Sequence, residues 1–199
     1  MIKTVTWGWE PPIYEKIGKK KIRIFFHSEQ QIDLIERENQ ETGEVEKEEV
    51  ISYLCKTIEI EDQELVSMIN KNPESFICQK RLLQERIKAY DMSEFVNSFS
   101  ISGKNLWLDK ATRVGLRLRF DSEVDLGKEI TTLWTDKFSI SLPLTGQISA
   151  KLILSLIENY ASECYDNTQR HLQLIEELKT TEELKSYDYT VGYPDKLVF

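Results

Sequence analysis

Histidine and cysteine, on which nucleophilic triads and many metal sites depend, are scarce in this chain. His27 and His171 are its only histidines, and it has no G-x-S-x-G, G-x-x-x-x-G-K-[ST], G-x-G-x-x-G or H-E-x-x-H motif. His171 lies on an apolar helical stripe, which favours a hydrogen-bonded histidine at the edge of a core over a general base, and His27 is expected at the surface. Spacing alone singles out no acid and nucleophile pair among 34 carboxylates. We therefore predict no catalytic residue, no enzymatic activity and no cofactor.

The three cysteines are predicted to be reduced and buried. Cys55, Cys78 and Cys164 are odd in number, far apart and without a C-x-x-C pair, a pattern that argues against both a disulfide framework and a metal site. No apolar run approaches the roughly 20 residues that cross a bilayer, and the N-terminus lacks a signal-peptide core. We expect a cytoplasmic protein without membrane contact.

Charge is distributed unevenly along the 199 residues, whose net charge is -8. The net acidity excludes a generic nucleic-acid binder, which needs surplus Lys and Arg. A basic run over 16–23 precedes a stretch from Glu29 to Glu49 with nine acidic and two basic residues. This stretch has the composition of an exposed loop or a solvated hairpin tip. The basic run could hold phosphate, but beside the acidic stretch it better fits two facing, complementary strands or a subunit contact.

The segment Trp7-Gly8-Trp9-Glu10-Pro11-Pro12 is the most unusual local feature. Its two tryptophans could stack on a sugar or serve as anchors in a protein partner. Alternatively, the two tryptophans lie on opposite faces of an edge strand, one of them completes the core, and the prolines end the strand. We predict a protein partner or a second copy, bound through Trp7, Trp9, Lys19, Lys20 and Lys21.

Periodicity divides the chain into three segments and predicts an α+β protein. Residues 1–60 contain alternating, β-branched and aromatic runs, which indicate a small sheet of three or four strands. Residues 61–97 form a helical connector, in which Asn72-Pro73-Glu74 is expected to start a helix with a buried stripe. The stripe consists of Phe76, Leu83, Ile87 and Tyr90.

Residues 98–199 are predicted to form a complete C-terminal domain, a β-hairpin packed with a long helix and shorter helices. Asp109 can cap a helix that stops near Gly127, although residues 116–120 also alternate like a strand. Residues 130–135 and 138–142 form the hairpin, and a helix over about 149–179 follows. Thr180 and Glu183 make a capping box for a last short helix.

Several separated motifs of the last hundred residues carry a resemblance to a known family. They are Phe99-Ser100-Ile101-Ser102-Gly103, Trp107-Leu108-Asp109-Lys110-Ala111-Thr112-Arg113, Leu133-Trp134, Ile140-Ser141-Leu142-Pro143, Tyr160-Ala161, Cys164-Tyr165-Asp166-Asn167-Thr168 with His171, Tyr187-Asp188-Tyr189-Thr190, and Gly192-Tyr193-Pro194-Asp195-Lys196-Leu197. In this order they resemble a domain of unknown function in bacteriophage and prophage proteins, often found beside or within products of the tail-fibre region. The opening residues 4–12 and 23–29 are similar to the start of gut-Bacteroidales phage proteins with this domain.

The resemblance implies a context rather than an activity, because the family brings no catalytic residues. It implies a phage product related to the tail or its assembly, located in the host bacterial cytoplasm during assembly, with the virion as a second location. The first hypothesis is therefore a non-enzymatic structural or accessory protein that acts by protein binding, with a homo-oligomer as one form.

Two other function classes stay open. An early phage regulator could inhibit a host defence protein, with the acidic stretch mimicking a nucleic-acid backbone. A hydrolase of surface glycans would need paired carboxylates in a pocket lined by Trp7, Trp9 or Trp134.

Overall fold

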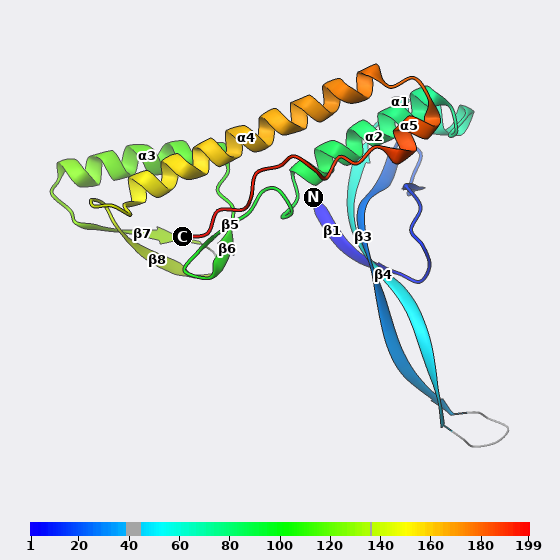
Figure 1. The fold of residues 1–199 in the computed structure, drawn as a ribbon, viewed down its shortest axis with the longest axis horizontal. Helices are drawn as coiled ribbons and strands as arrows, with labels where there is room; N and C mark the ends of the chain where they lie inside the picture. The colour runs from blue at the N-terminus through cyan, green and yellow to red at the C-terminus, as the bar shows by residue number, and fades with distance from the viewer. Residues whose placement is uncertain (39–44, 136) are drawn as a thin grey trace. The chain divides into compact units, whose positions relative to one another are not determined.

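The computed structural model describes residues 1–38, 45–135 and 137–199, and it has the predicted α+β fold (Figure 1). The chain forms two compact units. The first unit contains residues 1–90 and 171–189, and the second unit contains residues 91–170 and 190–199. Helix α4 (Ala150–Glu177) contributes residues to both units.

A four-stranded antiparallel sheet forms the first unit together with three helices. Its strand order is β1-β4-β3-β2, and its four strands agree with the predicted small sheet of three or four strands. The elements of this unit besides its part of α4 are β1 (Ile2–Trp7), β2 (Tyr14–Lys16), β3 (Lys21–Glu38), β4 (Val45–Glu61), α1 (Gln63–Lys71), α2 (Phe76–Asp91, of which Asp91 belongs to the second unit) and α5 (Thr181–Ser186).

One face of this sheet is apolar and packs on helices, because side chains alternate between the two faces of a strand. Ile22 and Ile24 of β3 and Ile58 of β4 lie on that face and pack against α1 and α2. Arg23 and Glu59, which lie opposite one another between these residues, point to the other face. The helices therefore cover one face, and the other face carries charges at one end and the aromatic side chains of Trp7 and Phe25 toward the other.

Helix α2 buries two sides, and its predicted stripe is confirmed. Leu83 and Ile87 join the end of α4, α5 and Tyr189 in a second core of the first unit, with Phe76 and Tyr90 at its edge. The predicted start of this helix is wrong. Asn72 is the C-cap of α1, and its side chain accepts from the Glu74 N–H, so that Pro73 lies in the connecting turn.

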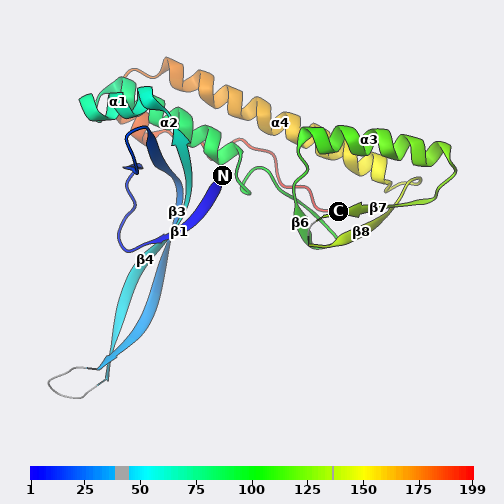
Figure 2. The same cartoon turned by 180° about the vertical axis from the view of Figure 1, so that it is seen from behind.

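Strands β3 and β4 continue far beyond the other two strands. The last residue of β1, Trp7, lies opposite Tyr53, and β2 pairs with β3 only up to Ile24. In the described residues beyond these points, β3 and β4 pair with each other alone (Figures 1 and 2). We call residues 29–38 and 45–52 the hairpin arm. The acidic stretch is thus mostly paired strand, and of the predicted loop only residues 39–44 lie outside the described residues.

The second unit packs two helices and two hairpins around one core. Asp109 caps α3, as predicted, by accepting from the Thr112 N–H at 2.7 Å, so residues 116–120 are helical. The hairpin predicted over 130–142 is also confirmed. The elements, with the first part of α4, are β5 (Phe99–Ile101), β6 (Lys104–Leu106), α3 (Lys110–Asp125), β7 (Ile130–Trp134) and β8 (Ser139–Pro143).

The C-terminal residues complete the second unit. The Phe199 N–H donates to the Ser100 carbonyl, and the Ser100 and Ser102 N–H groups donate to the Leu197 and Phe199 carbonyls, each at 2.9 Å. Upstream of this ladder, Asn167 of α4 donates to the Val191 carbonyl at 3.1 Å. The hydroxyl of Thr168, also buried on α4, bonds to that of Tyr193 at 2.9 Å. Backbone pairing and two buried side chains of α4 therefore hold the last residues to the unit.

All three cysteines are buried, and we expect them to be inert in the folded protein. Burial raises the pKa of each thiol, that of Cys164 to about 11, and the thiolate is the reactive form. A thiol reagent at mildly alkaline pH should therefore label the protein only at the rate of unfolding, and label all three cysteines in denaturant. Rapid labelling of a native thiol would contradict this expectation.

Candidate protein-binding site

The two tryptophans of the opening motif lie together at the end of β1. The Trp7 ring packs edge-on against Phe25, with 5.2 Å between centroids, and Trp9 packs edge-on against Trp7 at 5.6 Å. Phe25 is buried, whereas Trp9 is 68% exposed. Trp7 therefore belongs to the covering of the sheet, and Trp9 offers an exposed aromatic face beside it.

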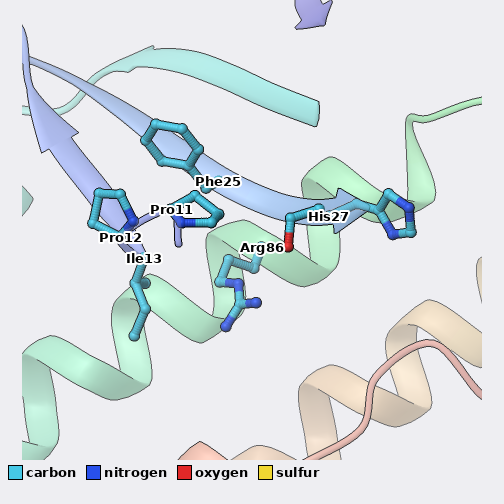
Figure 3. A pocket seen from close by; sticks show the side chains of 7 residues that line it. Pro11, Pro12, Ile13, Phe25, His27 and Arg86 are labelled. Atoms are coloured by element: carbon cyan, nitrogen blue, oxygen red, sulfur yellow. The ribbon is translucent and has the colours of Figure 1, made fainter. Parts of the chain in front are cut away.

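A small pocket opens next to Phe25 (Figure 3). Pro11 and Pro12 lie beside the ring of Phe25, and the side chain of Arg86 comes from α2. The pocket volume is about 80 Å³, too small for a substrate or cofactor but enough for a single side chain. The Arg86 guanidinium lies over the Tyr189 ring at 5.3 Å, and among the described residues its buried Nε has no acceptor. The pocket therefore combines apolar walls with one cationic side chain, Arg86.

A cluster of charges occupies the opposite end of the open sheet face. Glu59 of β4 accepts from Lys3 at 2.9 Å, from Arg23 at 3.0 Å and from Lys21 at 3.1 Å. Arg23 also pairs with Glu15 at 2.7 Å. The hydrogen bonds from Lys3, Arg23 and Lys21 lower the pKa of Glu59 to about 2.

This cluster predicts a loss of stability in acid. A carboxyl whose pKa is lower in the folded than in the unfolded chain stabilises the fold above its unfolded pKa of about 4.3 and ceases to do so as the pH falls toward 2. Urea unfolding between pH 6 and pH 2 should therefore show a steeper loss of stability for the wild type than for Glu59→Gln. Equal pH slopes for the two proteins would contradict the assignment.

The predicted site residues do not form one site. Lys21 is opposite Glu61 on β4, whereas Trp7 is opposite Tyr53, so roughly 27 Å of strand separates them. Lys19 and Lys20 are exposed in the turn before β3. The partner of Lys21 is Glu59, not the acidic stretch, so the expectation that the basic and acidic runs form facing strands is wrong, and the alternative of a subunit contact stays a prediction.

An apolar stripe on the hairpin arm was missed by sequence reasoning. Ile32 and Ile51 lie opposite one another, and Leu34 follows Ile32 on the same face. These side chains are 57%, 47% and 66% exposed. The alternation Ile32-Asp33-Leu34 signals a strand, but the surrounding acids concealed it. The same face leads toward the sheet through Tyr53, which is opposite Trp7.

Acidic side chains surround this stripe. The arm has seven acidic and two basic residues, and Glu49 lies directly opposite Leu34. Glu36 and Lys47 pair farther out at 3.7 Å, both largely exposed. An exposed apolar surface rimmed by charge is typical of a protein-binding site. The arm, with Trp9 near its base, is therefore the candidate site.

A larger hollow of about 540 Å³ lies in the second unit. Its lining includes two carboxylates, but Glu158 pairs with Arg113, and Asp91 accepts from Thr168 at 2.9 Å. Its tryptophan is Trp107, not one of the three that the hydrolase hypothesis requires. Within the described ranges, we find no group of His, Cys, Asp and Glu side chains able to hold a metal ion. No helix among the described residues is long and apolar enough to span a bilayer.

Comparisons with protein-family models, with curated proteins and with solved structures find no match for this chain.

Proposed function

We propose that the chain is a non-enzymatic accessory protein of a phage or prophage tail region, and that it acts by binding another protein through the hairpin arm. The phage context is supported by the resemblance of residues 98–199 to the phage domain. The mode of action is supported by one observation above all, the exposed stripe of Ile32, Leu34 and Ile51 on an acidic two-stranded arm.

The chemistry of the arm defines the partner. Unpaired strand edges and exposed apolar side chains promote association unless something covers them. The acids along the arm repel nucleic acid and select a protein with basic residues around an apolar patch. Shielding the apolar stripe provides affinity, and the charges provide orientation and a fast encounter.

The proposal is tested by removing the stripe. The variant Ile32→Ser/Leu34→Ser changes only exposed side chains, so the fold should persist. In cells that produce the phage, the tagged wild-type chain should cross-link to tail proteins and be recovered with particles or tail-assembly intermediates, while the variant should be depleted from both.

A matched control changes exposed apolar residues that are not part of the arm. Leu126 and Ile130 of the second unit are 77% and 62% exposed, and Leu126→Ser/Ile130→Ser should behave like the wild type. Absence of the wild-type chain from particles and from all assembly intermediates contradicts the tail role. Equal incorporation of the arm variant contradicts the role of the arm.

The inhibitor of a host defence protein remains the second candidate, because an acidic arm also suits the basic cleft of a nucleic-acid-binding host protein. The apolar stripe favours the first candidate, since a mimic of a phosphate backbone needs regularly placed carboxylates and no apolar centre. Expression timing separates the two. An inhibitor is made early and is needed only in hosts with the defence, whereas a tail component is made late and is needed in every host.

A further inference from the structure

Helices α3 and α4 of the second unit form a groove whose chemistry complements the arm. The two helices run antiparallel, as the contacts of Arg113 with Glu158 and of Arg117 with Ser155 require, and Figure 1 shows them side by side. Between them lies a largely apolar depression of about 280 Å³. Its lining consists of Arg113, Val114, Arg117, Leu154, Ser155 and Glu158.

The rim of this groove combines exposed apolar side chains with cations. Val114 is 54% exposed and Leu118, one turn farther along α3, is 66% exposed. Arg117 donates to the Ser155 hydroxyl at 3.0 Å and lies 3.8 Å from Asp121, so its charge is only partly balanced. Lys110, one turn before Val114 on α3, lines the neighbouring hollow of about 540 Å³ rather than the groove itself, and it has no ion-pair partner among the described residues. The groove is therefore an apolar strip with a surplus of positive charge.

We propose that the groove of one copy of this chain binds the hairpin arm of a second copy. The inference rests on the proposed role of the arm as a docking surface and names one partner for it. Ile32, Leu34 and Ile51 would cover the apolar floor and Val114 and Leu118. On the same face of the arm, Glu49 and Glu36, the second of which lies 3.7 Å from Lys47, would meet Arg117 and Lys110.

Charge favours this arrangement over one in which the arms of two copies bind each other. Two arms facing one another would bring two acidic surfaces together, which repel. An arm in a groove joins surfaces of opposite sign. Because the two surfaces differ, a single contact leaves one copy with a free groove and the other with a free arm. The free surfaces either meet each other, which closes a reciprocal dimer, or bind further copies, which builds a larger ring or a filament.

Sedimentation velocity of the purified chain tests the inference directly. The wild type should associate as its concentration rises, to a closed dimer or to larger assemblies, and association should weaken several-fold from low to high salt. The arm variant Ile32→Ser/Leu34→Ser and the groove variant Val114→Ser/Leu118→Ser should each associate about 100-fold more weakly. Leu126→Ser/Ile130→Ser is the control and should associate like the wild type.

Mixing the two variants gives the sharpest result. The arm variant retains an intact groove and the groove variant an intact arm, so the mixture should form a one-to-one heterodimer that grows no further. A wild type that stays monomeric at every concentration overturns the inference, as does a mixture that stays monomeric. A groove variant that still dimerises identifies an arm-to-arm contact and also overturns it.

Failure of this inference is distinguishable from failure of the proposed function. If the chain is monomeric but its arm is needed for incorporation into particles, the tail protein is another chain and the groove has no part in it. If the groove variant is incorporated normally while the arm variant is not, the same conclusion follows. If neither self-association nor incorporation depends on the arm, both proposals are wrong.

Discussion

Replacing Gly192 by alanine should destabilise the second unit by about 3 kcal/mol, the largest effect that we expect from any single exposed position. Gly192 has a φ of +82°, and a Cβ built there would lie 2.8 Å from Oδ1 of Asn167. The left-handed conformation costs alanine about 1–2 kcal/mol. The clash would also displace Asn167 from the Val191 carbonyl, a hydrogen bond worth about 1 kcal/mol.

Amide exchange should locate this effect in the C-terminal ladder. The amides of Ser100, Ser102 and Phe199 pair across the ladder that follows Gly192, so they should exchange faster in Gly192→Ala. The urea midpoint of unfolding should fall as well. Amides of the sheet in the first unit serve as the internal reference, because the substitution touches no residue there.

Gly127 provides a matched control in the same unit. Its φ is +72°, but nothing lies within 4 Å of the Cβ that alanine would add. Gly127→Ala should therefore show only the conformational cost of about 1–2 kcal/mol. Adding Asn167→Ala to Gly192→Ala should cost less than the sum of the two single changes, because the clash is gone. Equal effects at both glycines would show that the contact with Asn167 is unimportant.

Tyr189→Phe should destabilise the first unit by about 1–3 kcal/mol. The Tyr189 hydroxyl donates to the carbonyl of Phe26 at 2.6 Å, and Tyr189 is only 5% exposed. Phe26 lies at the β-bulge between Phe25 and His27, where the register with β4 shifts and the ladder skips a residue. Removing the hydroxyl leaves that buried carbonyl without its donor, while the ring still packs against Arg86.

Urea unfolding and amide exchange around the bulge measure the effect. Tyr165→Phe is the control, because Tyr165 is 59% exposed and its hydroxyl contributes no hydrogen bond in the described structure. It should unfold like the wild type. A Tyr189→Phe protein that is as stable as this control would mean that water replaces the lost donor at the bulge.

Local patterns account for the elements that were predicted well. Capping by Asp109 and by Thr180 with Glu183 depends on residues three positions apart, and the α4 stripe that includes Ile157 and His171 depends on helical spacing. His171 is 6% exposed and bonds to the Tyr187 hydroxyl at 2.7 Å, as expected for a histidine at the edge of a core. Such interactions are complete within a turn or two, so the sequence contains them directly.

The same local rules failed at Asn72, where two answers are chemically equivalent. An asparagine before a proline suits the start of a helix, but it suits the end of one as well. Its N–H bonds to the Met68 carbonyl of α1, and Ser75 then makes the hydrogen bonds that begin α2. The choice depends on where the apolar faces of α1 and α2 meet the sheet, which no short window of sequence specifies.

In the candidate site, too, some features follow from local sequence patterns and others from the complete fold. The sequence by itself determined that Trp7 and Trp9 adjoin a strand end, that the acidic stretch carries exposed side chains and that histidine and cysteine are scarce. Only the tertiary structure decided that this stretch is a paired arm with an apolar stripe, that Glu59 holds Lys21 and Arg23, and that Asn167 requires a glycine at position 192. Strand register and close approach between distant residues follow from burying whole faces together, so they arise from the complete fold rather than from any local pattern.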